Sequence, residues 1–84
     1  MTPDRLVLVE WDDATQPTSE WAETDTLDVS TPAVCQSVGW VLSKSARTIA
    51  LAANQTNDPP QVSGVIRIPT SAIRRMVDLT PVEM

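Results

Sequence analysis

The sequence predicts a mainly β fold: a small, strongly bent antiparallel sheet or β-barrel of about five strands, with a long acidic loop after the first strand. Apolar residues recur with a two-residue period in the runs before Pro69, which is the spacing of strands. Polar or proline-rich turns separate these runs. The chain has 84 residues and is 42% hydrophobic, so residues 1–84 are expected to form one domain with a small core.

The first two strands are expected at residues 6–11 and 34–43. The first run, LVLVEW, is apolar at odd and even positions, so we expect both of its faces to be covered. Gly39 lies within the second strand, where a missing side chain permits a sharp bend. The large apolar residues of the second strand share one face, which predicts that this face lies in the core. They are Val34, Val38, Trp40 and Leu42.

Two further strands follow on consecutive turns. A polar turn at residues 43–47 precedes a third strand at 49–53. Residues 54–60 contain the sequence NDPP and are expected to form a loop. The fourth strand is expected at 61–68, and Pro69 ends it because proline cannot donate to a ladder.

The last segment has two interpretations. Thr70 or Ser71 can cap a helical turn, and Ile73, Met76 and Val77 fit helical spacing. The same apolar residues could instead form a short final strand. The sequence leaves this choice open.

Residues 12–32 are predicted to be an acidic loop insertion. A loop this long in a small domain is usually functional, disordered or a short extra element. A helical turn could form at residues 18–23, where Thr18 or Ser19 can cap it. Trp21 is a large apolar residue in this polar segment, and we expect it to anchor the loop on the sheet or, alternatively, to bind a partner.

Charge is distributed unevenly along the chain, whose net charge is −5. Residues 10–28 contain seven carboxylates and no Lys or Arg, whereas five of the six basic residues follow position 33. The acidic balance argues against nonspecific binding of nucleic acid. No stretch approaches the roughly 20 apolar residues of a membrane span, and the start of the chain does not resemble a signal peptide. We therefore expect no membrane association and a cytoplasmic location.

The residue types present argue against an enzyme. The chain has no His, so the commonest general base is absent and Cys35 has no imidazole partner. Asp12 and Asp13 are adjacent and would point to opposite faces of a strand. One Cys and no His also exclude a disulfide within the chain and a structural zinc site. We expect no catalytic residues, no metal and no cofactor.

Five residues are candidates for binding a ligand or a partner. Trp11 ends a strand beside the acidic loop and Trp21 lies within it, so either indole could stack on a partner. Arg67, Arg74 and Arg75 could hold phosphates. The alternative for the arginines is pairing with the acidic loop.

The second half of the chain resembles Sm-like (Hfq-type) small β-barrels. The run VGWVLSKSARTIAL, residues 38–51, is similar to the first Sm motif, and IRIPTSAIRRMV, residues 66–77, is similar to the second. Ser45 stands where the first motif usually has Asp, and the N-terminal helix of Sm proteins is missing. The resemblance implies a barrel and a possible ring, in which the fourth strand of one subunit pairs with the fifth strand of its neighbour. With WDDA near its start and SVGW at residues 37–40, the chain also resembles small accessory proteins of tailed phages.

These observations predict a noncatalytic interaction module, of the phage accessory type, that self-assembles and binds a host or viral protein through its acidic loop. If the chain is encoded by a phage, it would act in the host bacterial cytoplasm. The first alternative is an oligomeric sponge that sequesters a nucleotide or a nucleotide-derived immune signal. The second is an Sm-like RNA-binding ring. A homo-oligomer is expected because the core is small and only Arg67 guards the strand around residues 64–68.

Overall fold

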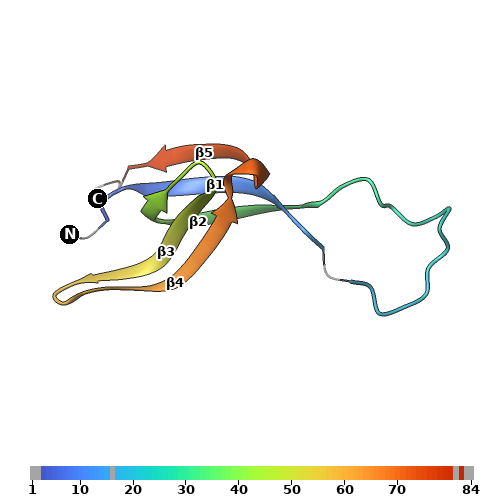
Figure 1. The fold of residues 1–84 in the computed structure, drawn as a ribbon, viewed down its shortest axis with the longest axis horizontal. Coiled ribbons are helices and arrows are strands. Elements are labelled where there is room, and N and C mark those ends of the chain that lie inside the picture. Colours follow the sequence, from blue (N-terminus) through green and yellow to red (C-terminus); the bar gives the residue numbers. More distant parts are fainter. Residues whose placement is uncertain (1–2, 16, 81, 83–84) are drawn as a thin grey trace.

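The chain folds into one open sheet of five antiparallel strands (Figure 1). The computed structural model describes residues 3–15, 17–80 and 82. The strands are β1 (Leu6–Asp13), β2 (Ala33–Lys44), β3 (Thr48–Asn57), β4 (Pro60–Pro69) and β5 (Ile73–Leu79), with a 3-10 helix, η1 (Thr70–Ala72), between the last two. The predicted mainly β fold is therefore confirmed.

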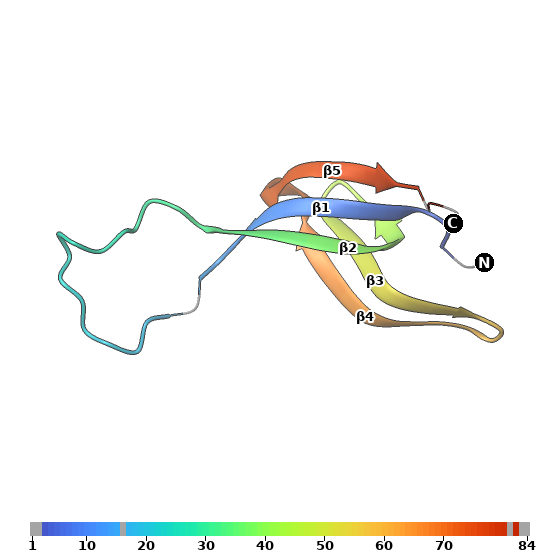
Figure 2. The ribbon, with the colours of Figure 1, turned by 180° about the vertical axis from the view of Figure 1, so that it is seen from behind.

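The strand order is β4-β3-β2-β1-β5, so the first strand pairs with both the second and the last. β4 and β5 are the two edge strands. Figure 2 shows that the sheet is strongly bent, because β3 and β4 run obliquely away from β1 and β5. The turn after β2 is tied to η1, since the Thr70 amide donates to the Arg47 carbonyl over 2.9 Å. The Thr70 hydroxyl also donates to the Ala46 carbonyl, over 2.6 Å.

One face of the bent sheet forms the core, which we call the inner face. Its centre is a cluster of fully buried apolar side chains from β1, β3 and β4, and partly buried residues pack around it. The buried cluster consists of Val7, Val9, Ile49, Leu51 and Ile68, and the surrounding residues are Trp11, Val41, Ile66, Ile73 and Met76.

The predicted core face of β2 is wrong. Val9 lies opposite Ser37, and Val7 lies opposite Gly39, so small residues of β2 face the core. The reason is the close approach of β3: a Cβ on Gly39 would lie 2.9 Å from the Leu51 Cβ and 3.0 Å from the Ala52 carbonyl oxygen. Val41 packs against the core, but the other large residues of β2 face the other way, with Val34 and Val38 exposed and Trp40 half-buried; Leu42 lies half-buried at a register shift.

The expected cover over both faces of β1 is also absent. Val7 and Val9 are fully buried, but Leu6 and Leu8 on the opposite face are only half-buried.

The β3–β4 hairpin is longer than expected. The ladder continues through Asn54, opposite Ser63, to Asn57, opposite Pro60, so the loop predicted at residues 54–60 is two residues long. The polar side chains that suggested a loop instead belong to a ribbon that projects from the sheet (Figure 1). Polarity there reflects exposure of the ribbon to solvent.

The end of the chain adopts the strand alternative. Leu6 pairs with Leu79 and Leu8 pairs with Val77, and this ladder fixes the segment as β5. Within the described ranges, helix is confined to η1, and the turn expected at residues 18–23 does not form. No helix of the described residues is long and apolar enough to cross a membrane.

Candidate functional site

Residues 14–32 connect β1 to β2 as a projecting segment, which we call the arm (Figure 1). It begins two residues later than the loop expected from the sequence, because Asp12 and Asp13 belong to β1. Every described residue of the arm is exposed. The arm contains four carboxylates, Glu20, Glu23, Asp25 and Asp28, and no Lys or Arg.

Trp21 lies in the arm with its side chain fully exposed. The expectation that it anchors the loop onto the sheet is wrong for the single chain. Leu27 and Val29 of the arm are also exposed. An arm with three exposed large apolar residues presents a surface suited to contact with another molecule.

Short local hydrogen bonds shape the arm. The Leu27 and Thr26 amides donate to the Glu23 carbonyl over 3.2 and 3.4 Å, which makes a turn. The amide of Ser30 donates to the Asp28 carboxylate over 3.0 Å, and the Ser30 hydroxyl donates to the same oxygen over 2.7 Å. The bond from the Ser30 amide and then the bond from its hydroxyl lower the pKa of Asp28.

Trp11 lies on the inner face, apart from Trp21 of the arm. It faces Cys35 of β2 and Ile73 of β5, and its indole N–H donates to the Ser37 hydroxyl over 3.0 Å. The indole is half-buried against the core. Its position is that of a packing residue at the edge of the core.

The three candidate arginines lie on the two edge strands. Arg67 is exposed on β4, and Arg74 and Arg75 are exposed on β5. Arg74 donates to the Asp12 carboxylate over 2.6 Å, and Arg75 lies opposite Glu10 on β1. Within one chain, β4 and β5 are opposite edges of the sheet and do not pair, so strand pairing does not bring Arg67 close to Arg74 and Arg75.

A second ion pair joins the start of the chain to β5. Arg5 donates to the Asp78 carboxylate over 2.7 Å, and this bond lowers the pKa of Asp78. A lowered folded-state pKa means that the pair stabilises the fold above the unfolded pKa of Asp, about 3.9, and that this stabilisation is lost as the pH falls through the folded pKa. Both side chains are largely exposed, so the effect is expected to be small.

For Asp78→Asn we therefore expect a slightly lower melting temperature than wild type at pH 7. The difference should shrink at pH 3, because the unfolded state then binds the proton while the folded state resists it less and less as the pH falls, and in high salt, which screens the pair. Thermal unfolding followed by circular dichroism at both pH values measures it. Asp58→Asn, at the tip of the hairpin, is the matched control, and an Asp78 difference that grows on acidification would contradict the assignment.

An apolar band on the face opposite the core is a feature that the sequence analysis missed. The strand registers place one apolar row across all five strands and a shorter row beside it. The first row is Val65, Ala52, Trp40, Leu6 and Leu79, and the second is Val38, Leu8 and Val77. Val65, Val38 and Val77 are 44%, 54% and 37% exposed. We call these eight residues the outer band. The signal for it was the run LVLVEW, which is apolar on both faces.

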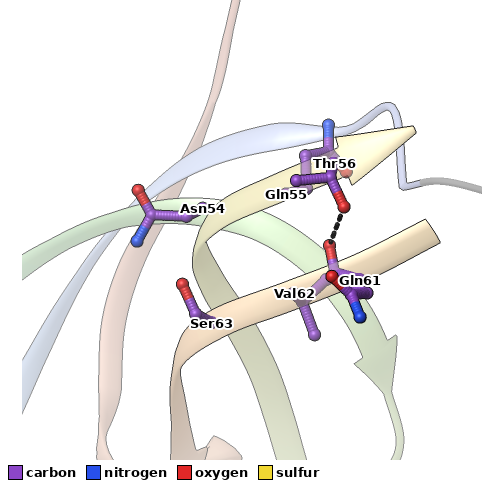
Figure 3. Close-up of a pocket in the computed structure, with 6 residues that line it drawn as sticks. All are labelled: Asn54, Gln55, Thr56, Gln61, Val62 and Ser63. Carbon is purple, nitrogen blue, oxygen red and sulfur yellow. Dashed lines mark hydrogen bonds between the residues drawn. The ribbon is translucent and has the colours of Figure 1, made fainter. Parts of the chain in front are cut away.

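A small polar pocket of about 140 Å³ lies on the β3–β4 hairpin (Figure 3). Residues 54–56 and 61–63 line it, and the Thr56 hydroxyl donates across the ribbon to the Gln61 carbonyl over 3.5 Å. The Gln55 side-chain oxygen is buried and has no hydrogen-bond partner among the described residues. However, Gln55 pairs with Val62 while Asn54 pairs with Ser63, so their side chains alternate between faces of the ribbon. The polar groups do not converge on one point.

The described residues contain no group of three or more side chains arranged to hold a metal ion. Comparison with family models, with curated proteins and with solved structures finds no match to this chain. Candidate function therefore depends on the arm, the edge strands and the outer band.

Proposed function

We propose that this protein is a noncatalytic interaction module that binds a partner protein through the arm, with Trp21 as the anchor. The observation that carries this proposal is the full exposure of Trp21 on a segment that projects from the sheet. Burying a Trp removes roughly 150–250 Å² from water, which at about 25 cal/mol per Å² gives about 4–6 kcal/mol before the cost of ordering the arm. Trp is also enriched among the residues that dominate binding energy at interfaces.

The charge of the arm defines the kind of surface that would receive it. Glu20 and Glu23 flank Trp21, and no cation of the arm neutralises them. Complementarity therefore favours a partner surface with an apolar centre and basic groups around it. The noncatalytic part of the proposal is supported by the absence of His from the chain and by the position of Cys35, which faces the Trp11 indole.

A second candidate function, an oligomeric sponge for a nucleotide, is favoured by the positions of the arginines. If β4 of one subunit paired with β5 of its neighbour, as the Sm-like resemblance implies, Arg67 would meet the neighbour's Arg74 and Arg75 at the seam. Two features accord with that resemblance: a glycine, Gly39, where β3 approaches β2 closely, and the 3-10 turn before β5. A thermal-shift screen with cyclic and adenine-containing nucleotides tests the sponge, because a ligand bound only by the folded state raises the melting temperature.

The arm proposal is tested by replacing Trp21 with a benzophenone amino acid and irradiating bacterial cells that express the protein. We expect a covalent adduct with a protein, identified by mass spectrometry. The same amino acid at Gln61, which is exposed on the hairpin, is the matched control and should give little adduct. If position 21 forms no protein adduct above this control, the arm is not a protein-binding site.

A further inference from the structure

We propose that the arm binds a second copy of this chain, laying Trp21 on the outer band and its carboxylates against the basic β2–β3 turn. This inference rests on the proposed function and names the partner. The outer band is an apolar sheet face in which Ala52 is buried and its leucines and Trp40 are half-buried, but its three valines are exposed. The arm has three exposed apolar residues of its own, Trp21, Leu27 and Val29.

Charge complementarity indicates that the arm of a second copy binds the outer band. Among the described residues, only Arg5 and Arg74 form ion pairs, so Lys44, Arg47, Arg67 and Arg75 are cations without a carboxylate partner within 4 Å. The arm holds four carboxylates and no cation. The arm is therefore acidic, whereas Arg47 and Arg67 lie at the end of the sheet that holds the β2–β3 turn; Arg75 lies apart from them, opposite Glu10 on β1.

The β2–β3 turn and Arg67 adjoin the outer band. Lys44 ends β2 opposite the buried Ile49, which places it on the inner side of the sheet near Asp78, and Arg47 lies in the turn that follows. Arg67 is two residues after Val65 on β4 and pairs with Ala50 of β3. A Trp resting on the band near Trp40 and Val65 would thus place the neighbouring carboxylates Glu20 and Glu23 toward this basic end.

The arm of the same chain points the wrong way for this contact. β2 begins at the arm and ends at Lys44, and its 12 residues separate the two by roughly 40 Å at about 3.3 Å per residue. Both views show the arm projecting away from the sheet (Figures 1 and 2). Two copies aligned in opposite directions could each place an arm on the other, which gives a closed, two-fold dimer.

Complementary charge reversal tests this arrangement. The first variant carries Glu20→Lys and Glu23→Lys in the arm, and the second carries Lys44→Glu and Arg47→Glu in the turn. In the first variant the arm's net charge rises from −4 to 0 and the groups beside Trp21 become basic, so these groups repel the basic turn. In the second variant the acidic arm repels the acidic turn. In an equimolar mixture, the basic groups beside Trp21 meet the acidic turn and the acidic arm meets the basic turn, so the dimer should return as a heterodimer. Arg67 is left unchanged because it belongs to the seam of the alternative sponge.

We expect wild type to be a dimer by light scattering at about 100 μM in low salt and to dissociate as salt screens the contact. Each variant alone should dissociate at least 100-fold more readily, and native mass spectrometry should show the heterodimer in the mixture. Gln61→Lys changes charge on the hairpin and should leave assembly as in wild type. A wild-type monomer, variants that assemble like wild type, or a mixture that stays monomeric would each overturn the inference.

The adduct formed from position 21 separates this inference from the proposed function. An adduct between two copies of the chain supports both. An adduct with a different protein, together with a monomeric wild type, supports the interaction module and overturns the second copy as its partner. No adduct above the Gln61 control overturns both.

Discussion

Ile49→Ala is expected to lower the free energy of unfolding by about 2–5 kcal/mol, the range measured for large-to-small changes in well-packed cores. Ile49 is 0% exposed and lies on β3, opposite Ile68 of β4. The whole domain should have a stability of roughly 4–12 kcal/mol by the usual value per residue. Loss of this one side chain therefore removes a large fraction of the total.

Urea unfolding followed by tryptophan fluorescence measures this loss. Val62→Ala is the matched control, because Val62 is exposed on the projecting hairpin and its truncation should cost less than about 1 kcal/mol. If Ile49→Ala unfolds within 1 kcal/mol of wild type, the inner face of the sheet is not the core that holds the domain together.

The number and direction of the strands could be predicted from the sequence because both depend on local signals. The two-residue period marks strands, and the turn after β2 is encoded by Ser45, whose hydroxyl accepts from the Arg47 and Thr48 amides over 3.2 and 3.1 Å. Ser45 thus supplies side-chain hydrogen bonds to this turn without the Asp expected from the Sm motif. The final strand was ambiguous because Ile73, Met76 and Val77 satisfy helical spacing, and only pairing with β1 decides it.

The faces of β2 could not be predicted because periodicity shows which residues share a face but not which face is buried. Val34, Val38 and Trp40 share a face as expected, yet that face is the outer one. The decision comes from Gly39, because β3 approaches it so closely at Leu51 and Ala52 that no side chain fits at this position. This is tertiary information, and it also explains why the outer band was missed.

The placement of Trp21 failed for a different reason. A large apolar residue was expected to be buried within its own chain. The sequence of one chain does not show whether another molecule supplies the surface that buries it. The contacts of candidate residues on the edge strands could not be predicted for the same reason. Arg67 and Arg75 lie on the edge strands β4 and β5, and what they contact depends on whether either strand has a neighbour.

Deleting the arm is expected to abolish binding while leaving the fold intact. Asp13 and Ala33 lie directly opposite each other in the ladder, so an Asn-Gly turn in place of residues 14–32 can join β1 to β2. The deletion removes no buried residue among those that the structure describes in the arm, because all of them are exposed. A shorter connection also loses less entropy when folding brings its two ends together. The free energy of unfolding should therefore stay the same or rise by about 1–2 kcal/mol.

Three measurements on this variant follow from that argument. Thermal unfolding should show a melting temperature equal to or above that of wild type, light scattering should show a monomer, and no partner should be captured. Trp21→Ala within the full-length arm is the companion variant, and it should weaken binding while the arm's carboxylates keep their charge. If the shortened protein is unfolded, the arm contributes to the fold. If it assembles and binds as wild type does, the interaction surface lies elsewhere. The open edges of β4 and β5 are then the next candidates, because the unpaired backbone groups of an edge strand can pair with another chain.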